Sequence, residues 1–393
     1  MINFTGEEKE QLRRRASQIP ALLDRIIIRR EKLKYPFLPA GAIYKGIWQE
    51  HNQDNLFITG IAPDAAWGSM DIFMRFQRED GLLPSAVNSE TLNAGFAQIQ
   101  AVYPFARCAL EIAKQLKRPE EDFARIRNSA ARYDAWLGKY RDPSGTGLVG
   151  MFCEFDTGHD NSPRVTDGGL PRQCPERNAG NMPELPCMPI LAPDLSAMRY
   201  GGMEALAELA EMFGDNADAD FWRNRAGELK EAIMRHLYCP EDEFFYDRSP
   251  QGFRKYRTEH ITRMFLNRVV DQSLFDRIYQ RYFTDENEFN TAYPFPSVSV
   301  SDPSFCKELP YNCWGGNTQM LTLLRLFLFM DFYRRGKELD HICGRCLRAF
   351  LQYPENRYAQ ELNPFTGEPI GDAGDYVPAI LLFRESCRRL NIG

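Results

Sequence analysis

The chain lacks the features that mark a membrane or exported protein. Its longest apolar stretch, residues 320–333, contains Arg325 and Asp331 and is too short to span a bilayer. The first residues, MINFTGEEK, show no apolar segment after a basic start, so we expect no signal peptide. Ten cysteines are scattered without a compact framework, a pattern typical of reduced thiols. These absences predict a soluble protein of the cytoplasm that makes no use of a membrane.

Positive charge and known cofactor motifs are also scarce. Lys and Arg number 48 against 54 Asp and Glu, and the resulting charge of −6 argues against nucleic acid as a partner. There is no glycine-rich phosphate loop and no Gly-x-Ser-x-Gly nucleophile turn. The pair Cys343 and Cys346 has no second pair of ligands to complete a zinc site, and no βαβ pattern surrounds it as a redox motif would require.

The sequence does contain strong helical periodicity. Apolar residues recur at helical spacing in ten segments, which are residues 7–34, 92–116, 120–140, 194–213, 217–237, 259–269, 272–283, 319–334, 338–352 and 375–390. Short breaks such as Gly214-Asp215-Asn216 join several of them as pairs of antiparallel helices. Few convincing strands are present, and no linker divides the chain. We therefore predict one all-α domain, 1–393, built as an (α/α)6 barrel in which the loops at one end form the pocket.

Two loops are longer than a compact protein normally allows. Residues 149–191 and 287–312 are rich in aromatic residues, Pro and Asn rather than in Ser, Lys and Glu. Loops of this length are either functional or disordered, and this composition favours an ordered, functional pair. A helical-repeat solenoid is the structural alternative, but no fixed repeat period is visible.

Each half of the chain carries a carboxylate within a turn-forming motif. Asp160 precedes Asn161-Ser162-Pro163, and Glu361 precedes Leu362-Asn363-Pro364. Taken alone, each motif is as well explained by a structural turn. Hydrolysis of a glycosidic bond needs two carboxyl groups, one protonated and one ionised, on either side of the anomeric carbon. Rigid loops of a helical protein can aim two such groups into one pocket, so the pair predicts a glycoside hydrolase.

Further side chains are suited to hold a sugar, because planar polar groups bind paired hydroxyls and aromatic faces cover the apolar side of the ring. Trp48 opens a run rich in amides and carboxylates, and Trp314 stands beside two glycines that permit a close backbone approach. An ordinary polar loop and a core tryptophan are the structural alternatives. The candidate substrate-binding residues are Trp48, Gln53, Asp54, Asp156, His159, Asn161, Arg164 and Trp314.

The motifs resemble a known family. The segments Arg141-Asp142-Pro143-x-Gly145-x-Gly147-Leu148-Val149, Asp160-Asn161-Ser162-Pro163-Arg164 and Asn363-Pro364-Phe365-Thr366-Gly367-Glu368 are similar to those of bacterial members of glycoside hydrolase family 63. These include mannosylglycerate and glucosylglycerate hydrolases and α-glucosidases. The resemblance implies an (α/α)6 barrel and inversion of the anomeric carbon without a metal or organic cofactor. It places the general acid at Asp160 and the general base at Glu361.

The chain departs from the family pattern at three places. Gln53-Asp54 stands where the family has Trp-Asp, and residues 314–318 stand where it has an Arg-Gly-Pro-x-Trp run. The family base lies one residue farther from the Asn-Pro than Glu361, at the position of Gln360.

The combined expectation is an inverting glycoside hydrolase acting on a small α-linked glycoside, a small carbohydrate being its partner. Two alternatives stay open. A sugar isomerase or epimerase on the same barrel would want a histidine as acid or base, for which His51, His159 and His260 are placed. A sugar-binding homologue without activity would fit the altered motifs.

Overall fold

The computed structural model describes residues 3–308, 313–354, 357–371 and 374–392. The described chain is mostly helical, and its strands are two or three residues long. It divides into two compact units, which we describe separately. The first comprises Met1–Ile28, Pro39–Lys45 and Gln272–Gly393, and the second comprises Arg29–Leu38 and Gly46–Asp271.

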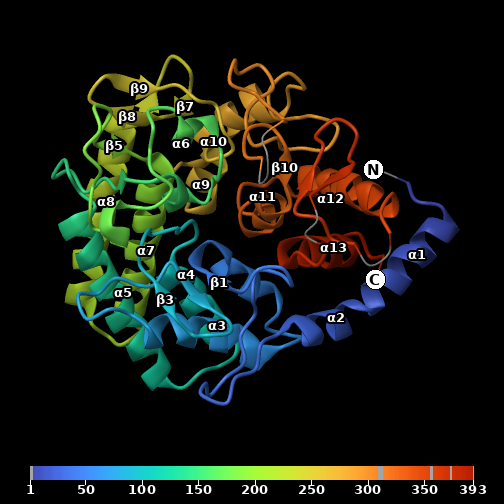
Figure 1. Ribbon diagram of the computed structural model, residues 1–393, viewed down its shortest axis with the longest axis horizontal. Helices are drawn as coiled ribbons and strands as arrows, with labels where there is room; N and C mark the ends of the chain where they lie inside the picture. Colours follow the sequence, from blue (N-terminus) through green and yellow to red (C-terminus); the bar gives the residue numbers. More distant parts are fainter. Residues whose placement is uncertain (1–2, 309–312, 355–356, 372–373, 393) are drawn as a thin grey trace. The chain divides into compact units, whose positions relative to one another are not determined.

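The first unit holds both ends of the chain. Its elements are α1 (Gly6–Ser17), α2 (Ile19–Ile26), α10 (Gln272–Ile278), a π-helical turn η4 (Tyr279–Phe283), β10 (Thr318–Gln319), α11 (Met320–Arg325), η5 (Leu326–Leu328), α12 (Gly336–Leu351), β11 (Glu361–Leu362), β12 (Pro369–Ile370) and α13 (Val377–Arg389). Helix α13 packs against α1, α11 and α12 (Figure 1). The buried guanidinium of Arg15 lies over the rings of Phe350, Tyr358 and Phe383, so a cation on α1 ties the first helix to the last two.

The second unit contains the longest helices. Its elements are β1 (Gly46–Trp48), η1 (Gln49–Phe57), α3 (Pro63–Arg75), β2 (Ala86–Asn88), β3 (Ala94–Gly95), α4 (Phe105–Gln115), α5 (Glu120–Tyr140), β4 (Gly150–Met151), η2 (Glu154–Thr157), α6 (Pro163–Thr166), η3 (Pro175–Arg177), β5 (Ile190–Leu191), α7 (Pro193–Met212), α8 (Asn216–His236), β6 (Tyr238–Cys239), β7 (Phe244–Phe245), β8 (Asp247–Ser249), β9 (Gly252–Arg254) and α9 (Ile261–Leu266). Helix α7 packs along α8 and also against α4, α5 and α9 (Figure 1). It is therefore packed against four other helices of this unit.

Short antiparallel sheets anchor the long loops. Strands β4, β5, β8 and β9 form one sheet, in which Met151 pairs with Ile190 and Leu191 pairs with Arg248. This sheet joins both ends of the predicted loop 149–191, which contains η2, α6 and η3 and is ordered as expected. In the first unit β10, β11 and β12 form a second sheet in which Gln319 pairs with Glu361. Residues 309–312 of the other predicted loop, 287–312, lie outside the described residues.

The mostly helical prediction is confirmed, and most predicted helices are present. The prediction for residues 120–140 matches α5, and those for 194–213, 217–237, 338–352 and 375–390 match α7, α8, α12 and α13 within a few residues. The predicted helix 7–34 is interrupted before Pro20, as expected of a proline, but it ends at Ile26 rather than at residue 34. No described helix is both long enough and apolar enough to cross a membrane.

One predicted helix starts later than expected, and one observed helix was not predicted. The helix predicted over 92–116 begins only at Phe105, with Pro104 as its N-cap, because the preceding residues form β3 and an irregular segment in which Gln100 has a φ of 42°. Helix α3 was not predicted at all. Eight of its thirteen residues are buried, including Ser69 and Gly68 as well as its apolar side chains, so it has no clear polar face to reveal a helical period.

Candidate active site

Asp160 lies in a tight turn of the second unit. The turn follows η2 and Gly158, whose φ is 70°, and it leads into the single helical turn α6, which begins at Pro163. Asn161 has a φ of 58°, a left-handed conformation that asparagine tolerates better than most residues, and the amide of Ser162 donates to the carbonyl of His159 at 3.0 Å. Asp160 and Asn161 are half-buried, whereas their neighbours His159, Ser162 and Arg164 are buried. The motif is thus a turn that leaves Asp160 at its tip.

A buried set of charges holds this turn from behind. Arg263 on α9 donates through Nη1 to the carbonyl of Thr157 at 2.6 Å, and its Nη2 lies 2.6 Å from His159 Nε2. The same ring nitrogen contacts the carboxylate of Glu259, and Arg164 donates to His159 Nδ1 at 3.2 Å. His159, Arg164, Glu259 and Arg263 are each at most 1% exposed. The residue immediately before Asp160 is therefore fixed at both ring nitrogens.

His159 is neutral in this environment. Burial, together with the nearby Arg263 charge, lowers its pKa to about 3 despite the opposing effect of Glu259. In the tautomer whose Nε2–H donates to Glu259, Nδ1 accepts from Arg164, and Arg263 Nη2, itself a donor, then gains no hydrogen bond from Nε2. His159 therefore serves as an anchor and not as a proton carrier at neutral pH.

Arg164 is held by two carboxylates. Its guanidinium donates to both oxygens of Asp194 at 2.9 and 2.6 Å and to both oxygens of Asp247 at 2.7 Å. Asp194 also accepts from Arg263 at 3.1 Å. Burial alone would raise the pKa of Asp194, but the charge of Arg164 and its hydrogen bonds lower it instead. The Arg164 group is saturated by protein contacts, so its part in this structure is to position α6.

Asp156 has a similar structural environment. It is fully buried beside Arg141, which donates to both of its oxygens, and it accepts from the amides of Ile99, Phe152 and Cys153 at 3.0, 2.7 and 3.2 Å. Five donors fill a carboxylate that has about four lone-pair sites, which leaves little capacity for a sugar hydroxyl.

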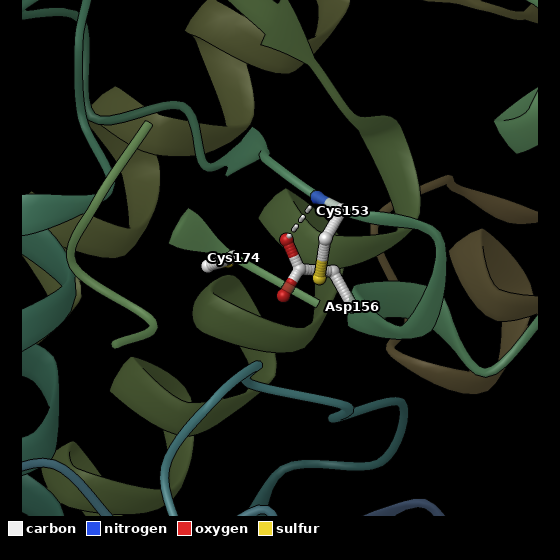
Figure 2. Close-up of side chains that lie close together, drawn as sticks. All are labelled: Cys153, Asp156 and Cys174. Carbon is white, nitrogen blue, oxygen red and sulfur yellow. Dashed lines mark hydrogen bonds between the residues drawn. The ribbon is translucent and has the colours of Figure 1, made fainter. Parts of the chain in front are cut away.

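Figure 2 shows Asp156 close to two thiols, those of Cys153 and Cys174, in an arrangement that resembles a metal site. Metal binding would require deprotonated thiols. Burial raises the pKa of the Cys153 thiol, and the guanidinium of Arg141 already donates to both Asp156 and Cys174. The donor set therefore fits a metal poorly, and we assign the cluster a structural role.

The predicted sugar-binding run lies at η1. Gln53 and Asp54 are 0% and 1% exposed. Gln53 Nε2 donates to Asp54 Oδ1 at 3.0 Å. The other oxygen of this carboxylate, Asp54 Oδ2, lies 3.1 Å from His51 Nδ1. Trp48, the last residue of β1, is half-buried. η1 meets the Asp160 loop directly, because a Cβ on Gly158 would lie 2.4 Å from Glu50 Oε2. Folding thus brings two of the predicted segments together within this unit.

Glu361 lies in the first unit on β11. Its Oε1 accepts from the amide of Cys313 at 2.9 Å and its Oε2 accepts from Asn317 Nδ2 at 2.8 Å. Glu361 is 4% exposed, and burial raises its pKa, an effect that the Asn317 and Cys313 hydrogen bonds partly oppose. A carboxylate with a raised pKa and two donors that favour its ionised form is suited to accept a proton.

The neighbouring positions differ in their partners. Gln360 accepts a hydrogen bond from the hydroxyl of Tyr44 and does not share the donors of Glu361. The turn that follows is built as predicted, because Asn363 Oδ1 accepts from the amides of Phe365 and Thr366 at 3.0 and 3.3 Å.

Trp314 is less open than a stacking platform needs. It is 2% exposed, and the space beside Gly316 is occupied by the carbonyl of Cys306, 2.9 Å from where a Cβ would stand. The glycine therefore permits a close approach of the protein backbone at this point. The role of Trp314 in substrate binding stays a prediction.

Sequence reasoning missed four residues of the charged set, namely Asp194, Asp247, Glu259 and Arg263. One signal was available, since Glu259 and Arg263 are four residues apart in an apolar helix, where an ion pair is expected. No comparable signal exists for Asp194 and Asp247, whose partners lie 30 and 83 residues away.

A family model and two curated relatives point to the same family. The model of the mannosylglycerate hydrolase MGH1-like glycoside hydrolase domain matches residues 57–377. Mannosylglycerate hydrolase MGH2 of Selaginella moellendorffii is 27% identical over 148 residues, which cover 32% of this chain and 30% of the relative, so the match spans under a third of that relative's length.

Solved structures share the fold. The GH63 mannosylglycerate hydrolase of Thermus thermophilus, determined in complex with glucose, has a TM-score of 0.72 at 19% identity and covers 94% of this chain and 99% of its own. Neutral trehalase Nth1 of Saccharomyces cerevisiae has a TM-score of 0.69 at 12% identity, covering 95% of this chain and 80% of its own.

Proposed function

Because this chain belongs to the mannosylglycerate hydrolase MGH1-like glycoside hydrolase family, we propose that it hydrolyses a small α-linked glycoside of the mannosylglycerate type with inversion. The family match over residues 57–377 is the observation that carries this proposal, since it includes both Asp160 and Glu361. We further propose the (α/α)6 arrangement of helices, which agrees with the mostly helical structure and the fold likeness to the Thermus hydrolase.

In the proposed reaction Asp160 is the general acid. Its proton passes to the glycosidic oxygen as the bond between that oxygen and the anomeric carbon breaks. An acid must approach the leaving oxygen in a fixed orientation, and the anchored residues His159 and Arg164 on either side of the turn support this. Asp160 and Asn161 are half-buried, whereas His159, Ser162 and Arg164 are buried, which supports a place for Asp160 beside the ligand.

Glu361 is the general base in this proposal. It takes a proton from a water molecule whose oxygen attacks the anomeric carbon from the opposite face, so the product sugar is released with inverted configuration. Two neutral donors, the Cys313 amide and Asn317, orient the carboxylate without an ion pair. An adjacent cation would hold the pKa low and weaken the base, and the raised pKa of Glu361 is consistent with the role.

The remaining predicted substrate contacts divide into two groups. Trp48 and Asn161, both half-buried, are proposed to touch the sugar. Asp156, His159 and Arg164 are proposed to act through the geometry of the Asp160 turn, because their polar atoms are engaged by protein groups. Gln53, Asp54 and Trp314 stay substrate-binding candidates from the family motifs.

Two of the three histidines named for the isomerase alternative, His159 and His260, are poorly suited to act as its acid. Burial lowers the pKa of His159 and of His260 to about 3, in each case with help from a neighbouring arginine. Neither ring would be an imidazolium near neutral pH, so neither is suited to serve as a general acid.

The test of function is direct. The full chain is incubated with mannosylglycerate, glucosylglycerate, trehalose and a panel of α-disaccharides, and the first-formed anomer is followed by NMR. We expect free sugar from a glycosylglycerate, with the β-anomer appearing first. An isomerised sugar would support the alternative enzyme, and absence of turnover on every compound would support a non-catalytic binding protein.

A further inference from the structure

The guanidinium of Arg141 contacts the loop 149–191 at several points along the chain. It makes five hydrogen bonds there, which is the number of N–H groups that an arginine side chain has. The acceptors are the carbonyl of Gly150, both carboxylate oxygens of Asp156, the sulfur of Cys174 and the carbonyl of Ala179. Arg141 is 0% exposed. Its donors are therefore committed entirely to this one loop.

Two of these contacts lie on opposite sides of Asp160 in the sequence. Asp156 comes before it and Cys174 comes after it. Arg141 Nη2 donates to both, at 3.0 Å to the carboxylate and at 3.4 Å to the sulfur. Figure 2 shows these two acceptors close together, and they lie within 4.8 Å of each other. A single nitrogen therefore joins the two arms of the segment 153–174, which carries Asp160 between them.

Main-chain hydrogen bonds lie beside this contact. The amide of Glu154 donates to the carbonyl of Pro171 at 2.9 Å, and the amide of Phe155 donates to the carbonyl of Arg172 at 3.3 Å. The two arms of the segment therefore run side by side next to the guanidinium. The turn that holds Asp160 is the part of the chain that connects them.

A different anchor holds the turn itself, because Arg263 donates to the carbonyl of Thr157 at 2.6 Å. A loop that is held at one place keeps rotational freedom about that place, and contacts at both of its arms remove this freedom. Orientation matters to a general acid, because a displacement of about 1 Å can lower a rate by about 10²-fold. Arg141 thus has the placement of a residue that sets the orientation of Asp160.

We propose that Arg141 is a positioning residue for the proposed general acid, because its planar fork holds both arms of the segment 153–174 and thereby fixes the orientation of Asp160. The inference rests on the proposed function for the role of Asp160 as the acid. It also assigns a task to the Arg141-Asp142-Pro143 motif, whose arginine takes no part in the proposed proton transfers. Lysine would not replace this arginine, since an ammonium offers three donors on one atom where the guanidinium offers five in a fixed plane.

The first test variant removes the ion pair without leaving a buried charge. In Arg141→Met/Asp156→Asn both charges disappear and asparagine keeps the shape of the aspartate, a change that costs less stability than the loss of one partner alone. The matched control is Arg199→Met/Asp134→Asn. This pair is also buried, with side chains 1% and 6% exposed, and its hydrogen-bond and ion-pair partners lie outside the segment 153–174.

The first measurement is hydrogen exchange of the amides of residues 153–174 in the full chain. Exchange should be at least about tenfold faster in Arg141→Met/Asp156→Asn than in the wild type, because the two arms lose the group that joins them. The control should exchange at the wild-type rate in this segment. Equal acceleration in the control would overturn the proposal.

The second measurement is the ratio of kcat/KM for two substrates, the glycosylglycerate that the chain cleaves and a dinitrophenyl glycoside of the same sugar. Dinitrophenolate leaves with little protonation, so a misplaced acid harms the first reaction more than the second. The ratio should fall by about tenfold to a hundredfold in Arg141→Met/Asp156→Asn. A merely structural role would lower both rates equally, in proportion to the folded fraction.

Arg141→Lys carries the test if the double variant does not fold. Lysine keeps a positive charge beside Asp156 but offers three donors in place of five, so both measurements should shift in the same direction by about threefold or more. Wild-type values of both in Arg141→Lys would overturn the proposal, because a charge alone would then be sufficient.

The two proposals fail separately. If exchange in the segment 153–174 stays as slow in the Arg141 variants as in the wild type, the inference is wrong whatever the chain hydrolyses. It is also wrong if exchange accelerates while the ratio of kcat/KM does not change. If exchange accelerates and no glycoside is cleaved even by the wild type, Arg141 does order the segment and the hydrolase proposal is the one that fails.

Discussion

Asp160 owes its position to its neighbours. The residues before and after it are tied to α9 and to the β8 strand by side chains that lie far away in the sequence, while the aspartate itself stays at the tip of the turn. This division suits the proposed acid, because the neighbours hold the backbone of the turn in a fixed position.

Replacing Asp160 by Asn keeps the shape of the side chain but removes the proton that it donates. We expect activity toward a substrate with a poor leaving group to fall by about 10²–10⁴-fold. A substrate with an acidic leaving group needs less protonation and should be partly spared, so the ratio of kcat/KM for the two substrates is the measurement. An equal loss on both would argue that Asp160 is not the acid.

The acidic limb of the pH profile of activity should follow the pKa of Glu361. Burial raises its pKa, so the base becomes protonated, and activity is lost, at a higher pH than for an exposed glutamate. Asn317→Ala removes a hydrogen bond that favours the ionised form and should move the acidic limb of kcat/KM upward by about one pH unit. If the acidic limb does not move, another group governs it, and Gln360 and its surroundings would be examined next.

At the scale of elements, α9 is expected to hold the Asp160 loop. Arg263→Met removes the donor to Thr157 and leaves Asp194 and Glu259 buried with fewer partners. The free energy of unfolding should therefore decrease by about 3–5 kcal/mol. Arg223→Met is the matched control, because Arg223 and Glu211 form an ion pair in which both side chains are 46% exposed. In the control the free energy of unfolding, measured by urea denaturation, should decrease by at most about 1 kcal/mol. Equal costs would contradict a special role for the buried set.

Two glycines test the contact between η1 and the same loop. Gly158 and Gly145 have nearly equal φ values, 70° and 66°, but a Cβ on Gly158 meets Glu50 at 2.4 Å whereas one on Gly145 meets nothing within 4 Å. Gly145→Ala should lower the free energy of unfolding only by the backbone strain of an alanine at positive φ, about 1–2 kcal/mol. Gly158→Ala should cost more and also weaken sugar binding, because Glu50 must move. Similar stabilities and affinities for the two variants would show that this contact is unimportant.

At the scale of the whole molecule, inversion makes a geometric prediction. In a crystal structure with bound sugar, the carboxyl groups of Asp160 and Glu361 should stand roughly 6.5–9.5 Å apart, which leaves room for a water molecule. A separation near 5 Å would indicate a retaining nucleophile instead.

The pocket is expected to be small and closed by the loops 149–191 and 287–312. A preference for long polysaccharides over small glycosides would contradict a small, closed pocket.

Sequence alone determined the features that depend on local chemistry. The period of apolar residues predicted α5 and α8 because each buries one face and exposes the other. The turn around Asp160 followed from Asn161-Ser162-Pro163, since a left-handed asparagine and a proline at the start of a helix are local preferences. The motif resemblance led to the family that the comparisons then showed.

Only the tertiary structure decided which polar residues hold the turn and which are left to meet a ligand. His159 and Arg164 were expected to touch substrate, yet His159 is engaged by Glu259 and two arginines, and Arg164 is engaged by Asp194 and Asp247. Glu50 and Gly158 meet across more than one hundred residues, and no local pattern distinguishes that glutamate from the other polar residues of η1. Contacts of this kind depend on how helices and loops pack, because the free energy of a buried charge depends on the partners that folding brings to it.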